Sequence, residues 1–258
     1  VGCQLREYAG EDSVSTLGHW IDALKEVHPR VPVRDLYQGS HWSSSMRCIE
    51  SARQLGFDTT FWILSAGWGI LHPDEKIPSY DATFSTDRKV EDRIHVLDWS
   101  EDLTNVQRAQ EWWTGLRGHH KESPRKLVDV PGIDTGINLF IISQEYYEAI
   151  EPELLELSGL NPNLLLVSAG LYSTGKVHQD LKQFLPPFTF DFQLYRQTLN
   201  NANTSLNADL ASWIMNDCPG ELAQGLDQLM TRIREVADSL PDASTMERDL
   251  FIDVALKI

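Results

Sequence analysis

Apolar and polar positions along the chain alternate between helical and strand patterns. Apolar residues three or four positions apart predict helices over residues 17–27, 42–55, 106–116, 146–157 and 222–240. Short, wholly apolar runs predict buried strands at residues 61–64, 137–143 and 164–167. Because strand and helix signals take turns, we expect an α/β fold with a mostly parallel sheet flanked by helices.

The domain organisation predicted from this pattern is a single α/β domain over residues 1–258. Residues 86–126 are rich in charged residues and are predicted to form a basic, Trp-rich insertion, and residues 216–258 are predicted to form a C-terminal helical segment. In the helix predicted at 42–55, one face carries Trp42, Met46, Ile49, Ala52 and Leu55. We expect that face to point into the core.

Two of the predicted strands end in the same tripeptide, Ser-Ala-Gly. Ser65, Gly67 and Trp68 follow the first strand, and Ser168 and Gly170 follow a later one. Loops at the carboxyl ends of strands line the ligand crevice of open α/β sheets. Residues 170–176 also match the glycine and lysine spacing of a phosphate-binding loop, but Val177 stands where Ser or Thr would hold Mg²⁺, so an anion-binding loop is the remaining prediction.

Further polar candidates lie next to these loops. Asp35 and Tyr37 precede the helix at 42–55, Tyr80 and Asp81 follow two prolines, and Asn207 opens a later helix after Thr204 or Ser205 as a helix cap. Asn can read a base edge because it offers both a donor and an acceptor. Helix capping and a hydrogen-bonded turn explain the same residues without a ligand.

Composition narrows the classes of partner. Lys plus Arg number 22 against 38 Asp plus Glu, which gives a net charge of −16 and argues against a broadly basic nucleic-acid surface. The three cysteines are widely separated and lack metal-ligand spacing, as is typical of a reducing cytoplasm. No apolar run is long enough to span a bilayer, so we expect no membrane partner. We also expect no metal and no cofactor.

A local basic stretch interrupts the acidic chain between residues 117 and 126. The candidates for gripping phosphates and stacking a base there are Trp112, Trp113, Arg117, Lys121, Arg125 and Lys126. The alternative is a solvated loop beside two core tryptophans. The pair His119-His120 has no third ligand nearby and does not predict a metal site.

The stretch Ser-Ala-Gly-Trp-Gly-Ile-Leu-His-Pro-Asp-Glu-Lys-Ile-Pro-Ser-Tyr-Asp, residues 65–81, resembles the signature of the YaaA peroxide-stress superfamily. The element Asp-Leu-Tyr-Gln-Gly at residues 35–39 resembles a second motif of those proteins. The resemblance covers residues 31–85 and departs at Gly67, where many relatives carry Lys. It implies a YaaA-like or uracil-DNA-glycosylase-like fold and an association with DNA, peroxide stress and base-modifying systems.

Carboxylates, aromatic rings and backbone donors without a Ser-His-Asp order suit cleavage of an N-glycosidic bond. The first hypothesis is a DNA glycosylase that flips out a damaged or modified base, such as a hypermodified phage base, with Asp81 and Asp35 as catalytic carboxylates. The second is a non-enzymatic DNA-binding stress protein of the YaaA type. The third is a nucleotide or nucleoside N-glycoside hydrolase, which needs no long phosphate track.

Overall fold

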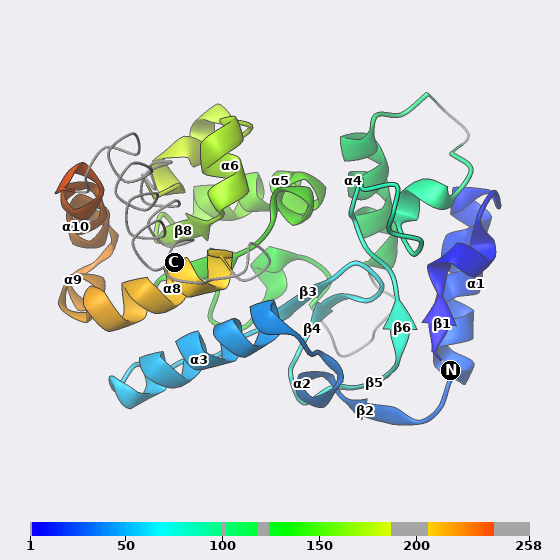
Figure 1. The fold of residues 1–258 in the computed structure, drawn as a ribbon, viewed down its shortest axis with the longest axis horizontal. Helices are drawn as coiled ribbons and strands as arrows, with labels where there is room; N and C mark the ends of the chain where they lie inside the picture. Colours follow the sequence, from blue (N-terminus) through cyan, green and yellow to red (C-terminus); the bar gives the residue numbers. More distant parts are fainter. Residues whose placement is uncertain (1, 100–101, 118–123, 187–205, 240–258) are drawn as a thin grey trace, which may run out of the picture. The chain divides into compact units, whose positions relative to one another are not determined.

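A computed structural model describes residues 2–99, 102–117, 124–186 and 206–239 and shows a mixed α/β protein rich in helix (Figure 1). The chain divides into two compact units where the sequence predicts a single domain. Unit 1 comprises Val1–Gln38, Thr60–Thr135 and Gln144–Asn161, and unit 2 comprises Gly39–Thr59, Gly136–Ser143 and Pro162–Ile258. In the part of the chain that the structure describes, no helix has the length and apolar character needed to cross a membrane.

The strands of the described residues form four two-stranded sheets, and the single, mostly parallel sheet predicted from the sequence is not observed. The parallel pairs are β1 (Cys3–Gln4) with β6 (Tyr80–Asp81) and β7 (Asn138–Ile141) with β8 (Leu164–Val167). The antiparallel pairs are β2 (Arg30–Pro32) with β5 (Lys76–Pro78) and β3 (Ile63–Ser65) with β4 (Gly69–Leu71). The difference arises at residues 66–68, where the chain turns straight back and pairs β3 with its own continuation.

Unit 1 combines these short strands with four helices in its described residues and three 3-10 turns. The helices are α1 (Ser13–Glu26), α2 (Val33–Leu36), α4 (Asn105–Leu116) and α5 (Gln144–Leu160), and the turns are η1 (Leu5–Tyr8), η2 (Ile94–Val96) and η3 (Leu127–Asp129). Asp12 caps α1 by accepting from the Ser15 N–H at 2.8 Å, and Thr104 with Gln107 forms a capping box at α4. These local signals place the helices close to where the apolar spacing predicts them.

Large aromatic side chains fill the core of unit 1. Trp20, Trp112, Trp113, Tyr147 and Phe84 are all fully buried. Burying an indole requires a partner for its N–H group, so the tryptophans also decide where polar acceptors must lie inside this unit.

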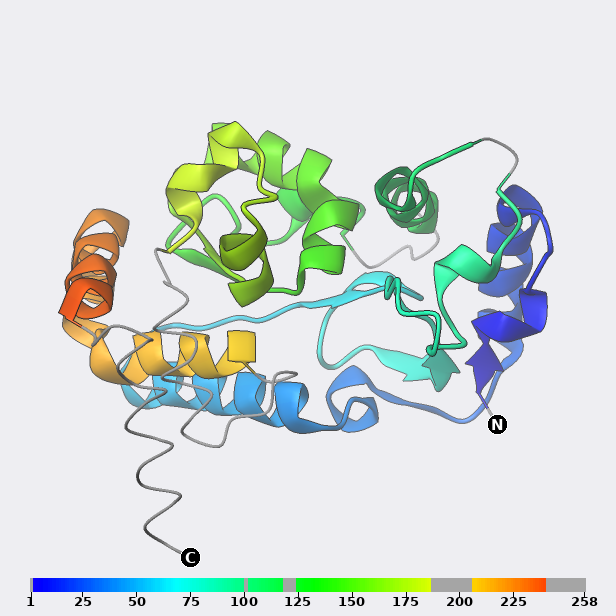
Figure 2. The same ribbon diagram turned by 45° about the horizontal axis from the view of Figure 1, so that its top comes forward.

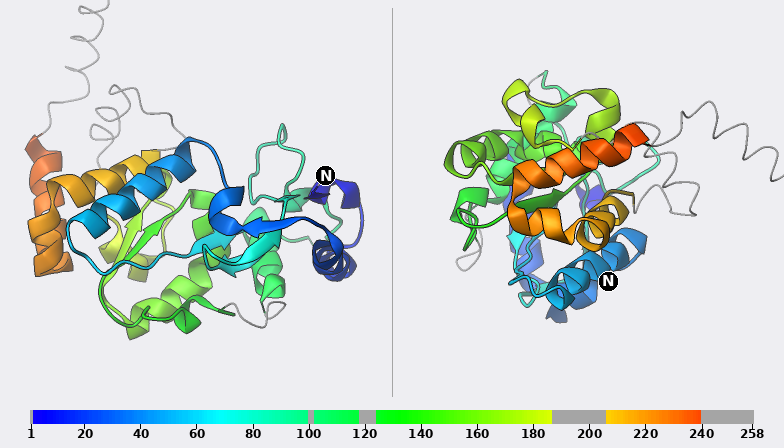
Figure 3. Two further views of the ribbon diagram at one scale, coloured as in Figure 1. Left: turned by 90° about the horizontal axis from the view of Figure 1, so that it is seen from below. Right: turned by 90° about the vertical axis from the view of Figure 1, so that its left-hand side faces the viewer.

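Unit 2 is built from helices packed around the β7–β8 pair. Its helical elements in the described residues are α3 (Ser40–Gln54), α6 (Ala169–Thr174), η4 (Gln179–Phe184), α8 (Leu206–Asp217), α9 (Pro219–Gln224) and α10 (Leu226–Ser239). Helices α3 and α8 lie side by side (Figures 2 and 3). One apolar cluster joins α3, β8, α8, α9 and α10.

The buried face of α3 is not the one predicted from the sequence. Ser44, Cys48 and Ala52 are its buried residues, whereas Leu55 is 47% exposed. Small side chains let α3 approach α8 closely, and the Ser212 hydroxyl of α8 donates to the Ser44 carbonyl at 3.3 Å. The bulkier Trp42, Met46 and Ile49 are only partly buried at the flank of this contact.

The C-terminal helical segment is two helices in its described part, where the sequence predicts one over residues 222–240. Gly225 separates α9 from α10 with φ of +115°, a conformation that residues with a Cβ rarely adopt. Figure 2 shows α10 running in a clearly different direction from α8. The described chain ends within α10, at Ser239.

The packing of α3 against α8 predicts opposite outcomes for two neighbouring serines. Ser44→Leu places a bulky side chain into the buried contact and is expected to lower the free energy of unfolding by about 1–3 kcal/mol. Ser43→Leu makes the same chemical change at an exposed position and is expected to stay within about 0.5 kcal/mol. Urea denaturation of both variants measures this, and equal losses would contradict the assigned face.

Candidate functional site

The Ser-Ala-Gly loop of unit 1 is the turn of a β-hairpin. β3 and β4 pair with Ser65 opposite Gly69, which leaves residues 66–68 as a three-residue connection. Gly69, the first residue of β4 after the loop, has φ of +83°, a left-handed conformation that residues with a Cβ rarely adopt. The loop therefore reverses the chain inside the protein, with Ser65 through Gly69 all buried.

Two buried tryptophans hold this loop through its carbonyl oxygens. Trp20 Nε1 donates to the Gly67 carbonyl at 2.9 Å, and Trp112 Nε1 donates to the Ala66 carbonyl at 2.7 Å. The donors come from α1 and α4, so two helices far apart in sequence meet at one turn. Trp112, predicted to stack a nucleic-acid base, is buried in this structure and supports the loop.

The hydroxyl groups of Ser65, Tyr80 and Tyr37 form a hydrogen-bonded chain beside the loop. Tyr80 contacts both Ser65 Oγ and the Tyr37 hydroxyl. Ser65 Oγ also accepts from the backbone N–H groups of Gly67 at 3.2 Å and Trp68 at 3.1 Å. Five of the residues expected at the site are thus brought together.

The direction of this chain follows from the valence of the hydroxyl groups. A serine hydroxyl has two lone pairs and one proton. Both lone pairs of Ser65 accept from the loop backbone, so its proton is donated to Tyr80. Tyr80 then donates to Tyr37, and the proton of Tyr37 is directed away from Tyr80. Each bond polarises the next, which strengthens Tyr37 as a hydrogen-bond donor.

The two motif segments meet because β2 and β5 are paired. The Val33 N–H donates to the Glu75 carbonyl at 2.8 Å and the Arg34 N–H to the Pro73 carbonyl at 3.0 Å, which fixes α2 on the segment before β5. Arg34 also forms an ion pair with Asp74 at 2.7 Å. Tyr37 directly follows α2, so this pairing delivers it to Tyr80.

The two candidate carboxylates are exposed. Asp35 lies on the outer side of α2, and Asp81 follows Tyr80 in β6, where successive side chains point to opposite faces. The hydrogen bond from Arg6 to Glu91 is the main cause that raises the pKa of Arg6, and the charge of Asp81 raises it further. The structure thus places Asp81 near Arg6 and records no contact between Asp35 and Asp81.

Burial controls the ionisation of the phenols. Desolvation is the largest cause that raises the pKa of Tyr37 and of Tyr80, and the neighbouring phenol raises that of Tyr80 further. Desolvation also raises the pKa of Tyr146, which packs edge-on against Phe84 with ring centroids 5.1 Å apart. All three phenols are therefore neutral donors at physiological pH, and Tyr146 is a member of the site that no sequence motif indicates.

The basic stretch beside α4 is partly engaged inside unit 1. Trp113, only 2% exposed, donates to the buried Glu153 carboxylate at 2.7 Å, and Arg117 forms an ion pair with the same carboxylate. Lys126 pairs with Glu156 at 2.9 Å. Trp113 and Arg117, predicted to grip nucleic acid, both bond the Glu153 carboxylate in this structure. Arg125 is exposed, and Lys121 lies outside the described residues.

The remaining candidates belong to unit 2. Asn207 accepts from the Ala169 N–H at 2.9 Å and donates to the Ile142 carbonyl at 2.7 Å, so its amide links the ends of β7 and β8 instead of facing a base. Gly170 lies within α6, and Gly175 ends that helix with φ of +65°. The first part of the predicted anion-binding loop is therefore helical. Ser168 is fully buried, and its hydroxyl has no hydrogen-bond partner in the structure.

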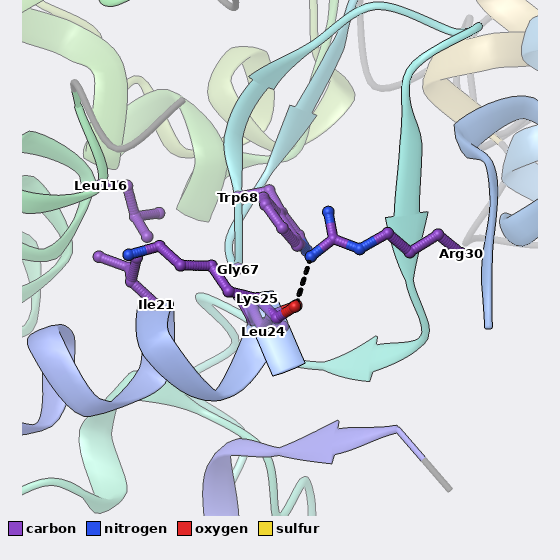
Figure 4. Close-up of a pocket in the computed structure, with 7 residues that line it drawn as sticks. All are labelled: Ile21, Leu24, Lys25, Arg30, Gly67, Trp68 and Leu116. Carbon is purple, nitrogen blue, oxygen red and sulfur yellow. Dashed lines mark hydrogen bonds between the residues drawn. The ribbon is translucent and has the colours of Figure 1, made fainter. Parts of the chain in front are cut away.

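A small cavity lies next to Gly67 and Trp68 of the hairpin loop (Figure 4). Its volume is about 110 Å³, and its lining residues are Ile21, Leu24, Lys25, Arg30, Gly67, Trp68 and Leu116. Arg30 donates to the carbonyls of Leu24 and Lys25 at 3.1 and 2.9 Å, which satisfies the C-terminal end of α1. The cavity is smaller than the roughly 150 Å³ that holds a benzene ring, so it has no room for a nucleotide.

Within the described ranges, no three His, Cys, Asp or Glu side chains gather so that they could hold a metal ion.

The groups that sequence reasoning missed are Trp20 and Tyr146, whose roles depend on long-range contacts with the loop. Their helical spacing indicates only that they face a core.

Comparison with known protein families gives a match over part of the chain. A model described as a family of unknown function (DUF6884) matches residues 23–112. The matched span runs from α1 to Trp112 and includes the hairpin, Tyr37 and Tyr80, but only part of unit 1 and a minority of the chain. No curated protein and no solved structure matches the sequence.

The loop geometry requires glycine at residue 67. A Cβ there would lie 2.5 Å from Cε2 of Tyr80 and 3.3 Å from Cζ2 of Trp20. Gly67→Ala is therefore expected to lower the free energy of unfolding by about 1–3 kcal/mol. Gly18→Ala, in the open middle of α1, has nothing within 4 Å and is expected to stabilise by up to about 1 kcal/mol. Thermal or urea denaturation compares them, and a neutral Gly67→Ala would contradict this packing.

The buried phenols predict a loss of stability at alkaline pH. The pKa of Tyr80 is raised in the folded state, so the stabilisation it gives is present below its ordinary value of 10.0 and is lost as the pH rises toward the folded value. Urea denaturation from neutral to alkaline pH is expected to show this decline, and Tyr80→Phe is expected to make it shallower. An identical decline in Tyr80→Phe would mean that other groups cause it.

Proposed function

We propose that the chain hydrolyses the N-glycosidic bond of a modified or damaged base in DNA, as a glycosylase of YaaA-like or uracil-DNA-glycosylase-like ancestry and α/β fold. The observation that carries the proposal is the hydrogen-bonded chain from Ser65 through Tyr80 to Tyr37. It joins the two segments that resemble the YaaA signature. It also presents neutral hydroxyl donors beside an aromatic loop.

Cleavage of this bond needs a group that holds the departing base and a carboxylate that steadies the cationic sugar or directs water. On this proposal, Tyr37 donates to the base as negative charge develops on it, because Ser65 and Tyr80 polarise its hydroxyl. Asp81 or Asp35 serves as the carboxylate. Asp35 lies two residues before Tyr37, and Asp81 follows Tyr80 with its side chain on the opposite face of β6.

A second candidate is hydrolysis of free nucleotides or nucleosides. The ion pairs of the basic stretch favour this candidate, because Arg117 pairs with Glu153 and Lys126 pairs with Glu156. Among the described residues, this leaves few cations there for tracking a duplex, whereas a small substrate needs only one phosphate contact. The chemistry at Tyr37 and the carboxylates is the same in both cases.

The test is release of free base, measured by chromatography, from DNA carrying normal, deaminated, oxidised or glucosylated bases and from the matching nucleotides. Asp81→Asn and Asp35→Asn are made separately, with Asp134→Asn as a control at another exposed aspartate of unit 1. Loss of the catalytic carboxylate is expected to lower the rate by about a hundredfold or more. Tyr37→Phe is expected to lower it by about tenfold or more, with Asp134→Asn unchanged.

The outcomes separate the candidates. Release from DNA but not from nucleotides supports the glycosylase, and the reverse supports the nucleotide hydrolase. No release from any substrate, together with salt-dependent binding to DNA, would replace both with a non-enzymatic DNA-binding protein of the YaaA type. Full activity in both aspartate variants would remove the carboxylates from the mechanism.

A further inference from the structure

Three basic side chains of unit 1 gather away from the hydroxyl chain. Arg93 and His95 lie at the turn η2, and Arg108 lies on α4, which packs against η2. Burial is the main cause that lowers the pKa of His95, and the charges of Arg108 and Arg93 lower it further, as expected for groups close in space. All three side chains are partly buried.

This cluster has no acidic counterpart in the described structure. The ion pairs of the described residues include none with Arg93, His95 or Arg108. The neighbouring carboxylates of Glu91 and Asp92 both turn to Arg6. Arg88 and Lys89 in the same segment also lack an ion pair with a described residue, but they are exposed, whereas Arg93, His95 and Arg108 are partly buried.

Buried nitrogen atoms of the same cluster are also unsatisfied. Arg93 Nε, Arg108 Nε and His95 Nδ1 are inaccessible to solvent and have no hydrogen-bond partner. Arg117 offers a comparison, because its Nε is likewise unpartnered but its guanidinium is neutralised by Glu153. Buried polar atoms are costly unless they are paired, so the unpartnered Nε atoms of two arginines beside one imidazole favour an anionic ligand.

We propose that Arg93, His95 and Arg108 form a binding site for a phosphate group, carried by a nucleotide or by a nucleic-acid backbone. Guanidinium groups bind phosphate through paired N–H donors, and Arg93 and Arg108 supply two such groups beside His95. The dominance of acidic residues elsewhere makes this cluster a local attraction for an anion. The site does not depend on the proposed hydrolysis, since a phosphate can bind here without any reaction.

Phe84 connects this site to the phenols. His95 forms a hydrogen bond with the backbone of Phe84, which raises its pKa against the larger lowering by burial, and the Phe84 ring packs edge-on against Tyr146. The proposed phosphate site and the phenols therefore lie on two sides of Phe84, a buried residue of unit 1. A phosphorylated substrate held at Arg93 and Arg108 would extend from this side of Phe84.

The experiment is isothermal titration of the full chain with inorganic phosphate at constant ionic strength, with chloride as the reference anion. Arg93→Gln, His95→Gln and Arg108→Gln are tested singly, with Arg88→Gln as the matched control. Arg88 is an exposed cation in the same segment, and its substitution by Gln removes the same charge. Circular dichroism confirms that each variant remains folded before its affinity is compared.

Phosphate is expected to bind to the wild type and to Arg88→Gln equally. Arg93→Gln and Arg108→Gln are each expected to weaken binding by about tenfold or more, because each loses a charge-assisted hydrogen bond. Titration with dCMP and with a single-stranded oligonucleotide then distinguishes the two sources of phosphate. Binding no tighter than that of chloride, or equal weakening in Arg88→Gln, would overturn the proposal, whether or not base release is observed.

Discussion

The arrangement of unit 1 around the hairpin turn depends on hydrogen bonds from two buried indoles. Trp20 and Trp112 donate to the carbonyls of Gly67 and Ala66, so α1 and α4 are both tied to a turn of three residues. A buried carbonyl without a partner is costly, and these bonds remove that cost where β3 turns into β4. With its carbonyls fixed, the loop directs its N–H groups to Ser65, and this orients the whole chain of hydroxyls.

Tyr80 shows how closely packing and polarity are coupled at this turn. Its ring lies against Gly67, where a Cβ would collide with it, and its hydroxyl connects Ser65 with Tyr37. The same ring that fills space therefore fixes the direction of proton donation. Burial keeps the phenols neutral by raising the pKa of Tyr80 and of Tyr37, so the cluster remains a set of hydrogen-bond donors.

Charge is distributed unevenly within the acidic chain. Buried Glu153 accepts from Trp113 and from the Leu127 N–H at 2.7 Å and pairs with Arg117, so one carboxylate organises the surroundings of α4 and η3. Around Arg93 and Arg108 the opposite holds, because no described carboxylate balances them. The first arrangement is complete within the protein, whereas the second is completed by an anion from solution.

The sequence by itself determined the elements and several members of the site, and tertiary contacts decided the rest. Apolar spacing located α1, α4 and α5, since a helix face must be apolar to be buried, and the motif residues Tyr37, Ser65 and Tyr80 do meet. Local pattern could not distinguish a hairpin from a parallel strand, nor show that small residues would form the buried face of α3. The sequence also predicted that Trp112 and Asn207 contact ligands, whereas in the structure both side chains bond the backbone. Such partners come from segments dozens of residues away, which only the folded chain brings together.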